Sequence, residues 1–321
     1  MHKKQLLLII ISQFLNLLNI NAQGVLCSWL SDPMVKNGQQ TLFMRTYITQ
    51  QEITNASLTI ASKGPYRLFV NGRAIYTSYV YGEALKPESD CETLYLDVTD
   101  YMRADSNTIA VWYAPNVDNR NFSYSEVQPM VAVNFYGIGN NGAEFSYISD
   151  STWICKNANG YSGMNIENEN ALEYVEGWNL GEPNDQMLWR HSQVVKSNWE
   201  TIMKSYQRQV FSDYSLKVIL PNYFDVADDK NVISYDFDKG FWGTVRVTIR
   251  GANVGKKIYF NGSEYVCNGQ LDEQYIGRFV HYGMRKLHIT GDSFFQTNQI
   301  VKVEGLELVK NNTAFIKRIR K

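Results

Sequence analysis

The sequence predicts an all-β protein with two β-sandwich domains in tandem. Short runs in which apolar and polar residues alternate recur along the chain, and a period of two is typical of half-buried strands. Gly, Asn and Pro residues separate these runs, as turns require. No stretch shows the period of a long amphipathic helix. A chain of 321 residues is also long enough for two domains of ordinary size.

The clearest strand signal lies at 244–250. Its three aliphatic residues point to one side of the expected strand, and its Thr and Arg residues point to the other. Gly240, Gly243 and Gly251 bracket this run, and we expect turns at all three. A similar alternation at 286–290 predicts a second strand. Both strands suit an antiparallel sandwich with one buried face and one face toward solvent.

The first half of the chain carries further strand and turn signals. Asn71-Gly72 is the strongest short hairpin signal, because both residue types accept the positive φ angles of a tight hairpin turn. A Gly- and Asn-rich turn at 137–142 separates two more strands. The expected strands are, in order, 42–48, 56–61, 66–70, 107–113, 130–136 and 144–148, with a last strand of the protein at 300–308.

Changes in composition divide the chain into segments. The expected segments are a signal peptide at 1–22, an N-terminal sandwich at 23–155, a long connecting loop at 156–200, a second sandwich at 201–310 and a basic tail at 311–321. The connecting segment is rich in Asn, Glu and Gly and has little periodicity. It also contains Tyr161, Tyr174 and Trp178, so we expect it to pack against the sandwiches rather than to be a disordered linker.

The N-terminal segment has the features of a secretory signal. A basic start is followed by an apolar run at 6–18, and Ala22 offers a small residue for cleavage. The run is too short and too interrupted by polar residues to span a membrane. We therefore expect a secreted or periplasmic protein. A lipid anchor at Cys27 is the alternative, although Leu26 stands where a lipoprotein site has a small residue.

The cysteines and the charge exclude several classes of function. Cys27, Cys91, Cys155 and Cys267 lie far apart, without the Cys-x-x-Cys spacing of a metal site. In an exported chain they form one or two disulfides, with three full pairings open, or they remain buried thiols. The formal net charge of −1, from 31 basic and 32 acidic residues, gives no electrostatic signal for nucleic acid or a membrane surface.

Motifs in both halves carry a family resemblance. The second half contains YDFDKGFWGTVRVTIRG at 235–251, then Glu264, Asn268-Gly269-Gln270 and HYGMRKLHITG at 281–291. In this order the motifs resemble the β-sandwich that precedes the catalytic barrel of bacterial α-L-rhamnosidases of the glycoside hydrolase family 78 type. Asp238 stands where that family usually has Gly, and Met284 where it has Phe.

The first half resembles the N-terminal domains of the same family. The Val70-Asn71-Gly72 hairpin is similar to that of galactose-binding-like jelly-roll domains, and the runs at 85–87, 94–102 and 107–113 follow the family order. Residues 88–91 replace an aromatic run that the family carries, so one ligand contact of the family is missing.

The resemblance implies a role with carbohydrates. The family cleaves terminal α-L-rhamnose with two carboxylates, and these lie in a helical barrel that has no counterpart in the present sequence. We therefore expect a secreted, non-catalytic carbohydrate-binding protein that acts in plant or bacterial polysaccharide utilisation on a rhamnose-containing or related glycan. Two alternatives remain open. One is a subunit of an α-L-rhamnosidase that a separately encoded glycoside hydrolase completes, or a truncated or degenerate form of such an enzyme. The other is a structural surface protein.

The enzyme-subunit alternative and the stand-alone binding protein differ in one expected feature. A chain that packs on a catalytic partner should expose apolar residues on its second sandwich, whereas a stand-alone binding protein should carry polar residues there.

Two loops, 76–85 and 116–128, are the expected sugar-binding site. The candidate residues are Tyr79, Tyr81, Glu83, Asn116, Asp118, Asn119, Arg120 and Tyr124. An aromatic face packs on the apolar side of a sugar ring, and the polar groups bind neighbouring hydroxyls. Asn116, Asp118 and Asn119 also offer oxygen ligands for calcium, the one cofactor that the sequence suggests. The alternative is a pair of polar loops whose Asn and Asp side chains cap turns.

Overall fold

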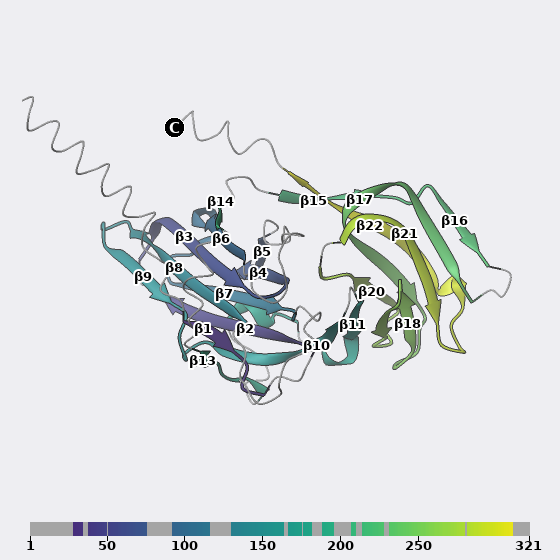
Figure 1. Cartoon of the computed structure of the whole chain (residues 1–321), viewed down its shortest axis with the longest axis horizontal. Coiled ribbons are helices and arrows are strands. Elements are labelled where there is room, and N and C mark those ends of the chain that lie inside the picture. Colours follow the sequence, from purple (N-terminus) through teal and green to yellow (C-terminus); the bar gives the residue numbers. More distant parts are fainter. Residues whose placement is uncertain are drawn as a thin grey trace, which may run out of the picture.

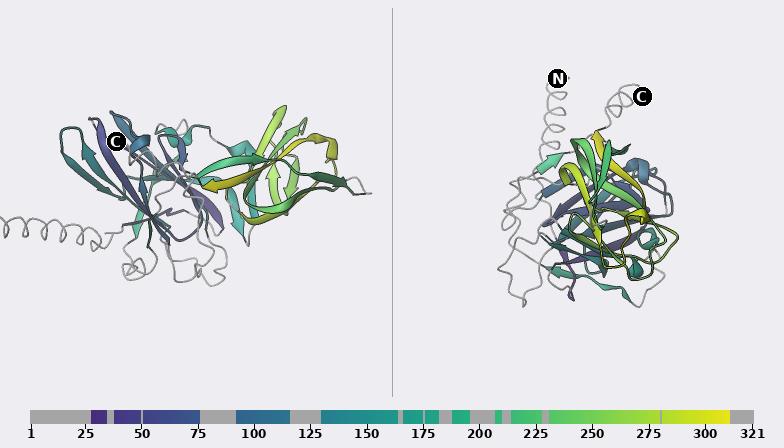
Figure 2. Two further views of the ribbon diagram at one scale, coloured as in Figure 1. Left: turned by 90° about the horizontal axis from the view of Figure 1, so that it is seen from above. Right: turned by 90° about the vertical axis from the view of Figure 1, so that its right-hand side faces the viewer.

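The protein is all-β, as the sequence predicts. The computed structural model describes residues 28–34, 38–49, 51–75, 92–115, 130–163, 166–174, 176–181, 188–195, 207–209, 214–227, 231–279 and 281–310. Within these ranges the regular structure is β-strand with a few short 3-10 turns, and no helix is long and apolar enough to cross a membrane. The strands form two sandwiches that follow one another along the long axis of the molecule (Figures 1 and 2).

The N-terminal sandwich consists of two facing sheets. One sheet contains β1 (Trp29–Ser31), β3 (Ile53–Ser62), β6 (Glu92–Asp97), β8 (Val131–Gly139), β9 (Glu144–Ile148), β13 (Gln193–Val195) and β14 (Gln207–Gln209). The other contains β2 (Gln39–Ile48), β4 (Tyr66–Val70), β5 (Arg73–Ile75), β7 (Ser106–Tyr113), β10 (Ile154–Gly163) and β12 (Arg190–His191). The strands expected from alternation in this half are therefore present, with ends that differ by a few residues.

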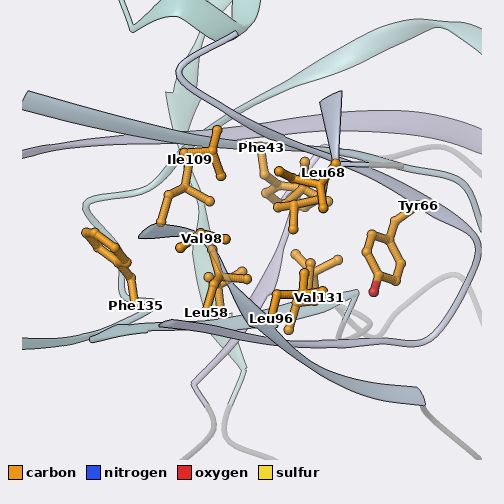
Figure 3. Packing of buried hydrophobic residues seen from close by; sticks show 14 of the residues in the cluster. Phe43, Leu58, Tyr66, Leu68, Leu96, Val98, Ile109, Val131 and Phe135 are labelled. Carbon is orange, nitrogen blue, oxygen red and sulfur yellow. The ribbon is translucent and has the colours of Figure 1, made fainter. Parts of the chain in front are cut away.

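The core of this sandwich comes from the inward-facing residues of both sheets. Figure 3 shows Phe43, Leu68 and Ile109 from one sheet pointing toward Leu58 and Val131 from the other. All of these side chains are buried. Successive residues of a strand point to opposite faces of the sheet. The residues next to these core residues therefore lie on the outer faces of the two sheets.

The Asn71-Gly72 hairpin is confirmed. Asn71 has φ 51° and Gly72 has φ 78°, the left-handed pair that a tight hairpin turn needs. The buried Asn71 amide also donates to the Tyr101 carbonyl and to Asn107 Oδ1 at 2.8 and 2.9 Å, and its oxygen accepts from the Thr108 N–H at 2.9 Å. The side chain thus fixes the turn to the neighbouring strand β7.

The second sandwich is built around one long strand. This strand, β17 (Ile233–Arg250), pairs with four other strands. Its other strands are β15 (Tyr214–Ile219), β16 (Tyr223–Val226), β18 (Lys257–Phe260), β19 (Ser263–Val266), β20 (Asp272–Ile276), β21 (His281–Gly291) and β22 (Ile300–Lys310). The first half of β17 pairs with β16 and β21, and the second half pairs with β20 and β22. The buried face of β17 forms the core with β21.

Of the three turns predicted around 244–250, the predictions at Gly240 and Gly243 are wrong. β17 runs without interruption through Gly240 and Gly243, and only Gly251, with φ 67°, lies in a turn. The pairing of β17 with β21 shifts register on both sides of Phe241, so the glycines lie in an irregular, bulge-like part of this strand pair. A Cβ on Gly243 would lie 2.0 Å from the Leu306 carbonyl oxygen, which explains the glycine by close packing rather than by a turn.

The segment expected to be a connecting loop contains strands. β10 extends to Gly163 and forms a hairpin with β11 (Ile166–Asn170), and β11 pairs in parallel with β19 of the second sandwich. Its Asn- and Glu-rich sequence shows no period of two, because pairing with strands on both sides, rather than one apolar face, holds it in the sheet. One sheet therefore continues from the first sandwich into the second.

Two of the cysteines are buried thiols. Cys155 and Cys267 are free, and burial raises the pKa of each to about 12. Cys27, Cys91 and the signal peptide at 1–22 lie outside the described residues.

Candidate functional site

The eight residues expected to bind sugar or calcium lie outside the part of the chain that the structure describes. These are Tyr79, Tyr81, Glu83, Asn116, Asp118, Asn119, Arg120 and Tyr124. Among the described residues, no group of three or more His, Cys, Asp or Glu side chains is placed to hold a metal ion. Within the described residues, a group of aromatic and charged side chains lies where the two sandwiches meet.

Four aromatic side chains cover the outer face of the β10–β2–β7–β4 sheet. Trp178, in the 3-10 turn Trp178–Leu180, packs edge-on against Phe69 and Trp112, with ring centroids 5.5 and 5.8 Å apart. Trp189 stacks on the other side of Trp178 at 6.4 Å. Trp112 Nε1 donates to Gln40 Oε1 at 2.6 Å. We call Phe69, Trp112, Trp178 and Trp189 the aromatic row.

Arg278 of the second sandwich packs on the aromatic row. Its guanidinium carbon lies 3.8 Å from the centre of the Trp112 ring, which is within the range of a cation–π contact. The same guanidinium donates to Glu169 through Nη2, and its Nε lies 3.7 Å from Glu167 Oε1. The Arg278 N–H donates to Glu167 Oε2 at 3.0 Å. We call Glu167, Glu169 and Arg278 the acid–arginine cluster.

The cluster is closed to solvent. The side chains of Glu167, Glu169 and Arg278 are only 7, 10 and 9% exposed. Burial raises the pKa of Glu167 to about 7, since desolvation and the neighbouring Glu169 outweigh the stabilising charge of Arg278. Burial also raises the pKa of Glu169, against the opposing effect of Arg278.

Strand β11 fixes both carboxylates in place. The Glu167 N–H donates to Ser263 Oγ at 2.9 Å, and Asn168 Oδ1 accepts from the Glu264 N–H at 2.8 Å. Because residues 167 and 169 are two apart on a strand, their side chains lie on the same face. The strand thus presents two acids side by side to a single arginine.

This arrangement joins the sandwiches and offers no exposed pair of acids for catalysis. Its outer rim carries exposed aromatic surface. The exposed Tyr174 ring lies 5.7 Å from the Arg278 guanidinium, and Trp189 is half-buried. Trp178 is buried, as we expected, but the same expectation was wrong for Tyr174. Sequence reasoning missed the cluster, because the strand that carries Glu167 and Glu169 has no apolar face to reveal it.

A second feature is an apolar strip on the outer face of the second sandwich. Tyr214, Leu216, Trp242 and Leu308, on β15, β17 and β22, pack together apart from the main core. The strip also includes Leu306, which is paired with Val218, and it continues through Val218 to Leu220, just beyond the end of β15. Val218 and Leu220 are 47 and 62% exposed. The strip has the property expected of a surface that packs on a partner.

Comparisons with known proteins agree with the fold. No protein-family model matches the chain, and no curated protein does. Among solved structures, the α-L-rhamnosidase of Dictyoglumus thermophilum matches 88% of this chain and 35% of its own, with 18% identity and a TM-score of 0.66. The α-L-rhamnosidase of Aspergillus terreus matches 90% of this chain and 36% of its own, with 15% identity and a TM-score of 0.63.

A third α-L-rhamnosidase, from Streptomyces avermitilis and solved with L-rhamnose, matches 84% of this chain and 28% of its own, with 18% identity and a TM-score of 0.64. The chain thus spans about a third of the length of these enzymes. At these identities the likeness is one of fold. It confirms the resemblance to the accessory sandwiches of α-L-rhamnosidases that the sequence motifs indicated.

Proposed function

We propose that this protein binds carbohydrate and does not itself catalyse glycan cleavage. The observation that carries the proposal is the fold, which most of the chain shares with about a third of three α-L-rhamnosidases. The ligand is a rhamnose-containing or related glycan of plant or bacterial polysaccharides. The protein is exported by its 1–22 segment, and calcium assists binding if the 116–128 loop provides the site.

Calorimetric titration tests this proposal. We expect heat of binding with L-rhamnose or a rhamnogalacturonan fragment, in the presence or absence of calcium, and no turnover of an aryl α-L-rhamnoside. If the site is formed by the predicted loops, Tyr81→Ala weakens binding about tenfold or more, because a ring that stacks on the sugar is lost. Tyr174→Ala is the matched variant at the rim of the aromatic row, and loss of binding there places the site at the junction.

The controls separate the alternatives. Galactose serves as the sugar control, and Asp118→Ala separates a calcium-dependent site from a purely aromatic one. Turnover of the aryl rhamnoside by the purified protein contradicts the non-catalytic role. Absence of heat with all three sugars contradicts carbohydrate binding.

A second candidate function is favoured by the apolar strip. In this proposal the protein is a subunit that packs on a separately encoded glycoside hydrolase, and the strip is the contact surface. An exposed apolar surface of this kind is stabilised by burial against a partner, at about 25 cal/mol per Å² of apolar area.

Charge placed in the strip should abolish such a complex. We expect the double variant Val218→Asp/Leu220→Asp to lose co-elution with the partner hydrolase in gel filtration, because burying two carboxylates without partners is unfavourable. Leu271→Asp, at a more exposed leucine between β19 and β20, is the control and should retain the complex. A complex that survives the double variant, or a wild-type protein that does not bind the hydrolase, contradicts the subunit role.

A further inference from the structure

Negative charge exceeds positive charge in the buried junction between the sandwiches. Glu167 and Glu169 share the guanidinium of Arg278. A third carboxylate, Glu273 on β20, raises the pKa of Glu169, and the guanidinium of Arg67 on β4 lowers it. Three carboxylates therefore face two guanidiniums in a region of low solvent access. An unbalanced buried charge is costly, and uptake of a proton removes it.

The position of each carboxylate indicates where the surplus charge lies. Glu273 accepts hydrogen bonds from the Tyr265 hydroxyl and from the N–H groups of Asn268 and Gly269, at 2.8, 2.6 and 3.2 Å. The Glu167 carboxylate accepts from the backbone N–H groups of Arg278 and Phe279, but its Oε1 atom accepts no hydrogen bond within the described residues. The surplus charge is therefore least compensated on Glu167 and its neighbour Glu169.

The other groups around the pair do not neutralise it. Tyr265 on β19 and Tyr275 on β20 are buried, and burial raises the pKa of both phenols, so they are uncharged near neutral pH. The Tyr174 ring lies 5.7 Å from the Arg278 guanidinium and is exposed. Glu264 on β19 is paired with Lys257 at 2.9 Å, outside the cluster. The described surroundings thus leave Arg278 and Arg67 as the cations that act on the pair.

The cluster also connects the two sandwiches physically. Glu167 and Glu169 lie on β11, which pairs with β19, and Arg278 packs on Trp112 of the first sandwich. We propose that this cluster is a pH-dependent junction, in which the Glu167–Glu169 pair holds one proton while the sandwiches are packed together and the packing loosens when the proton leaves.

The direction of the pH dependence follows from Glu167. Its folded-state pKa of about 7 lies above the ordinary value of 4.5. At pH values below 4.5 the folded and unfolded states both carry the proton, and the contribution to stability is fully present. As the pH rises through about 7 the folded state loses its proton, and the contribution is lost. The junction is therefore most stable in mildly acidic solution.

Thermal unfolding of the whole mature protein between pH 5 and pH 8 tests the proposal. We expect the wild-type Tm to fall with rising pH by about 5 °C more than that of Glu167→Gln, which keeps the shape of the protonated acid. Small-angle X-ray scattering of the native proteins should show a larger radius of gyration at pH 8 than at pH 5 for the wild type, and no such change for Glu167→Gln.

A second variant and a control complete the design. Glu169→Gln removes the surplus charge from the other member of the pair, so it should also flatten the profile of Tm against pH. This variant keeps the test valid if Glu167→Gln does not fold. Glu264→Gln changes an acid on the adjacent strand outside the cluster and should retain the wild-type profile. Parallel Tm profiles for the wild type and both cluster variants, or a wild-type radius of gyration that is the same at both pH values, overturn the proposal.

Discussion

Arg278→Ala is expected to lower the free energy of unfolding by about 3–5 kcal/mol, the range found when one partner of a buried ion pair is removed. The substitution leaves Glu167 and Glu169 buried without their shared cation and removes the cation–π contact with Trp112. Because Arg278 links β11 to Trp112 of the aromatic row, we expect the loss to appear in unfolding of both sandwiches. Urea denaturation followed by circular dichroism measures it.

Arg250→Ala is the matched control for this experiment. Arg250 also forms an ion pair, with Asp272 at 2.6 Å, but both side chains are about half exposed. Solvent screens such a pair, and we expect no measurable change in the urea midpoint. If Arg278→Ala and Arg250→Ala have equal midpoints, the acid–arginine cluster does not stabilise the junction. Protonation of Glu167 and Glu169 should make the Arg278→Ala loss smaller at pH 5 than at pH 8.

Gly243→Ala is expected to destabilise the second sandwich by about 3 kcal/mol, at the upper end of the cost of overpacking. The new methyl group would meet the Leu306 carbonyl oxygen at 2.0 Å, and this oxygen belongs to the backbone of the paired strand β22. Backbone in a central strand pair cannot move aside as a flexible side chain does. Chemical denaturation of the purified variant measures the loss.

Gly240→Ala on the same strand provides the comparison. Its Cβ would lie 3.4 Å from the nearest atoms, those of Gly283, which is ordinary van der Waals contact. We expect this variant to unfold at the wild-type midpoint or slightly above, because alanine restricts the unfolded chain more than glycine does. A Gly243→Ala variant as stable as Gly240→Ala would show that β17 and β22 are not paired closely at this point.

The sandwich strands and the family resemblance were predictable from particular residues. Asn71-Gly72 identified its hairpin because few residue pairs accept two successive left-handed conformations. Asp238 is a second residue whose position depends on a left-handed backbone conformation. It stands where the family has Gly, and its φ of 62° shows that the position does require a left-handed backbone.

The junction was not predictable from local pattern. Glu167 and Glu169 lie on a strand without an apolar face, so its sequence has no alternation to detect. Arg278 follows them by more than a hundred positions, and only the tertiary fold, including the parallel pairing of β11 with β19, brings the three side chains together. The apolar strip was also hidden, because Val218 and Leu220 look like core residues until the sheet shows which of its faces is covered.

By itself the sequence determined the all-β class, most of the strands, the principal hairpin and the resemblance to rhamnosidase sandwiches. These features depend on residue periodicity and on backbone preferences that act over a few positions. The tertiary structure alone decided that β17 passes straight through two glycines, that the 154–170 region joins the sheets, and that an arginine is shared by two buried acids. Those features depend on contacts between distant segments, whose energies come from close packing and from charge in a region that water does not reach.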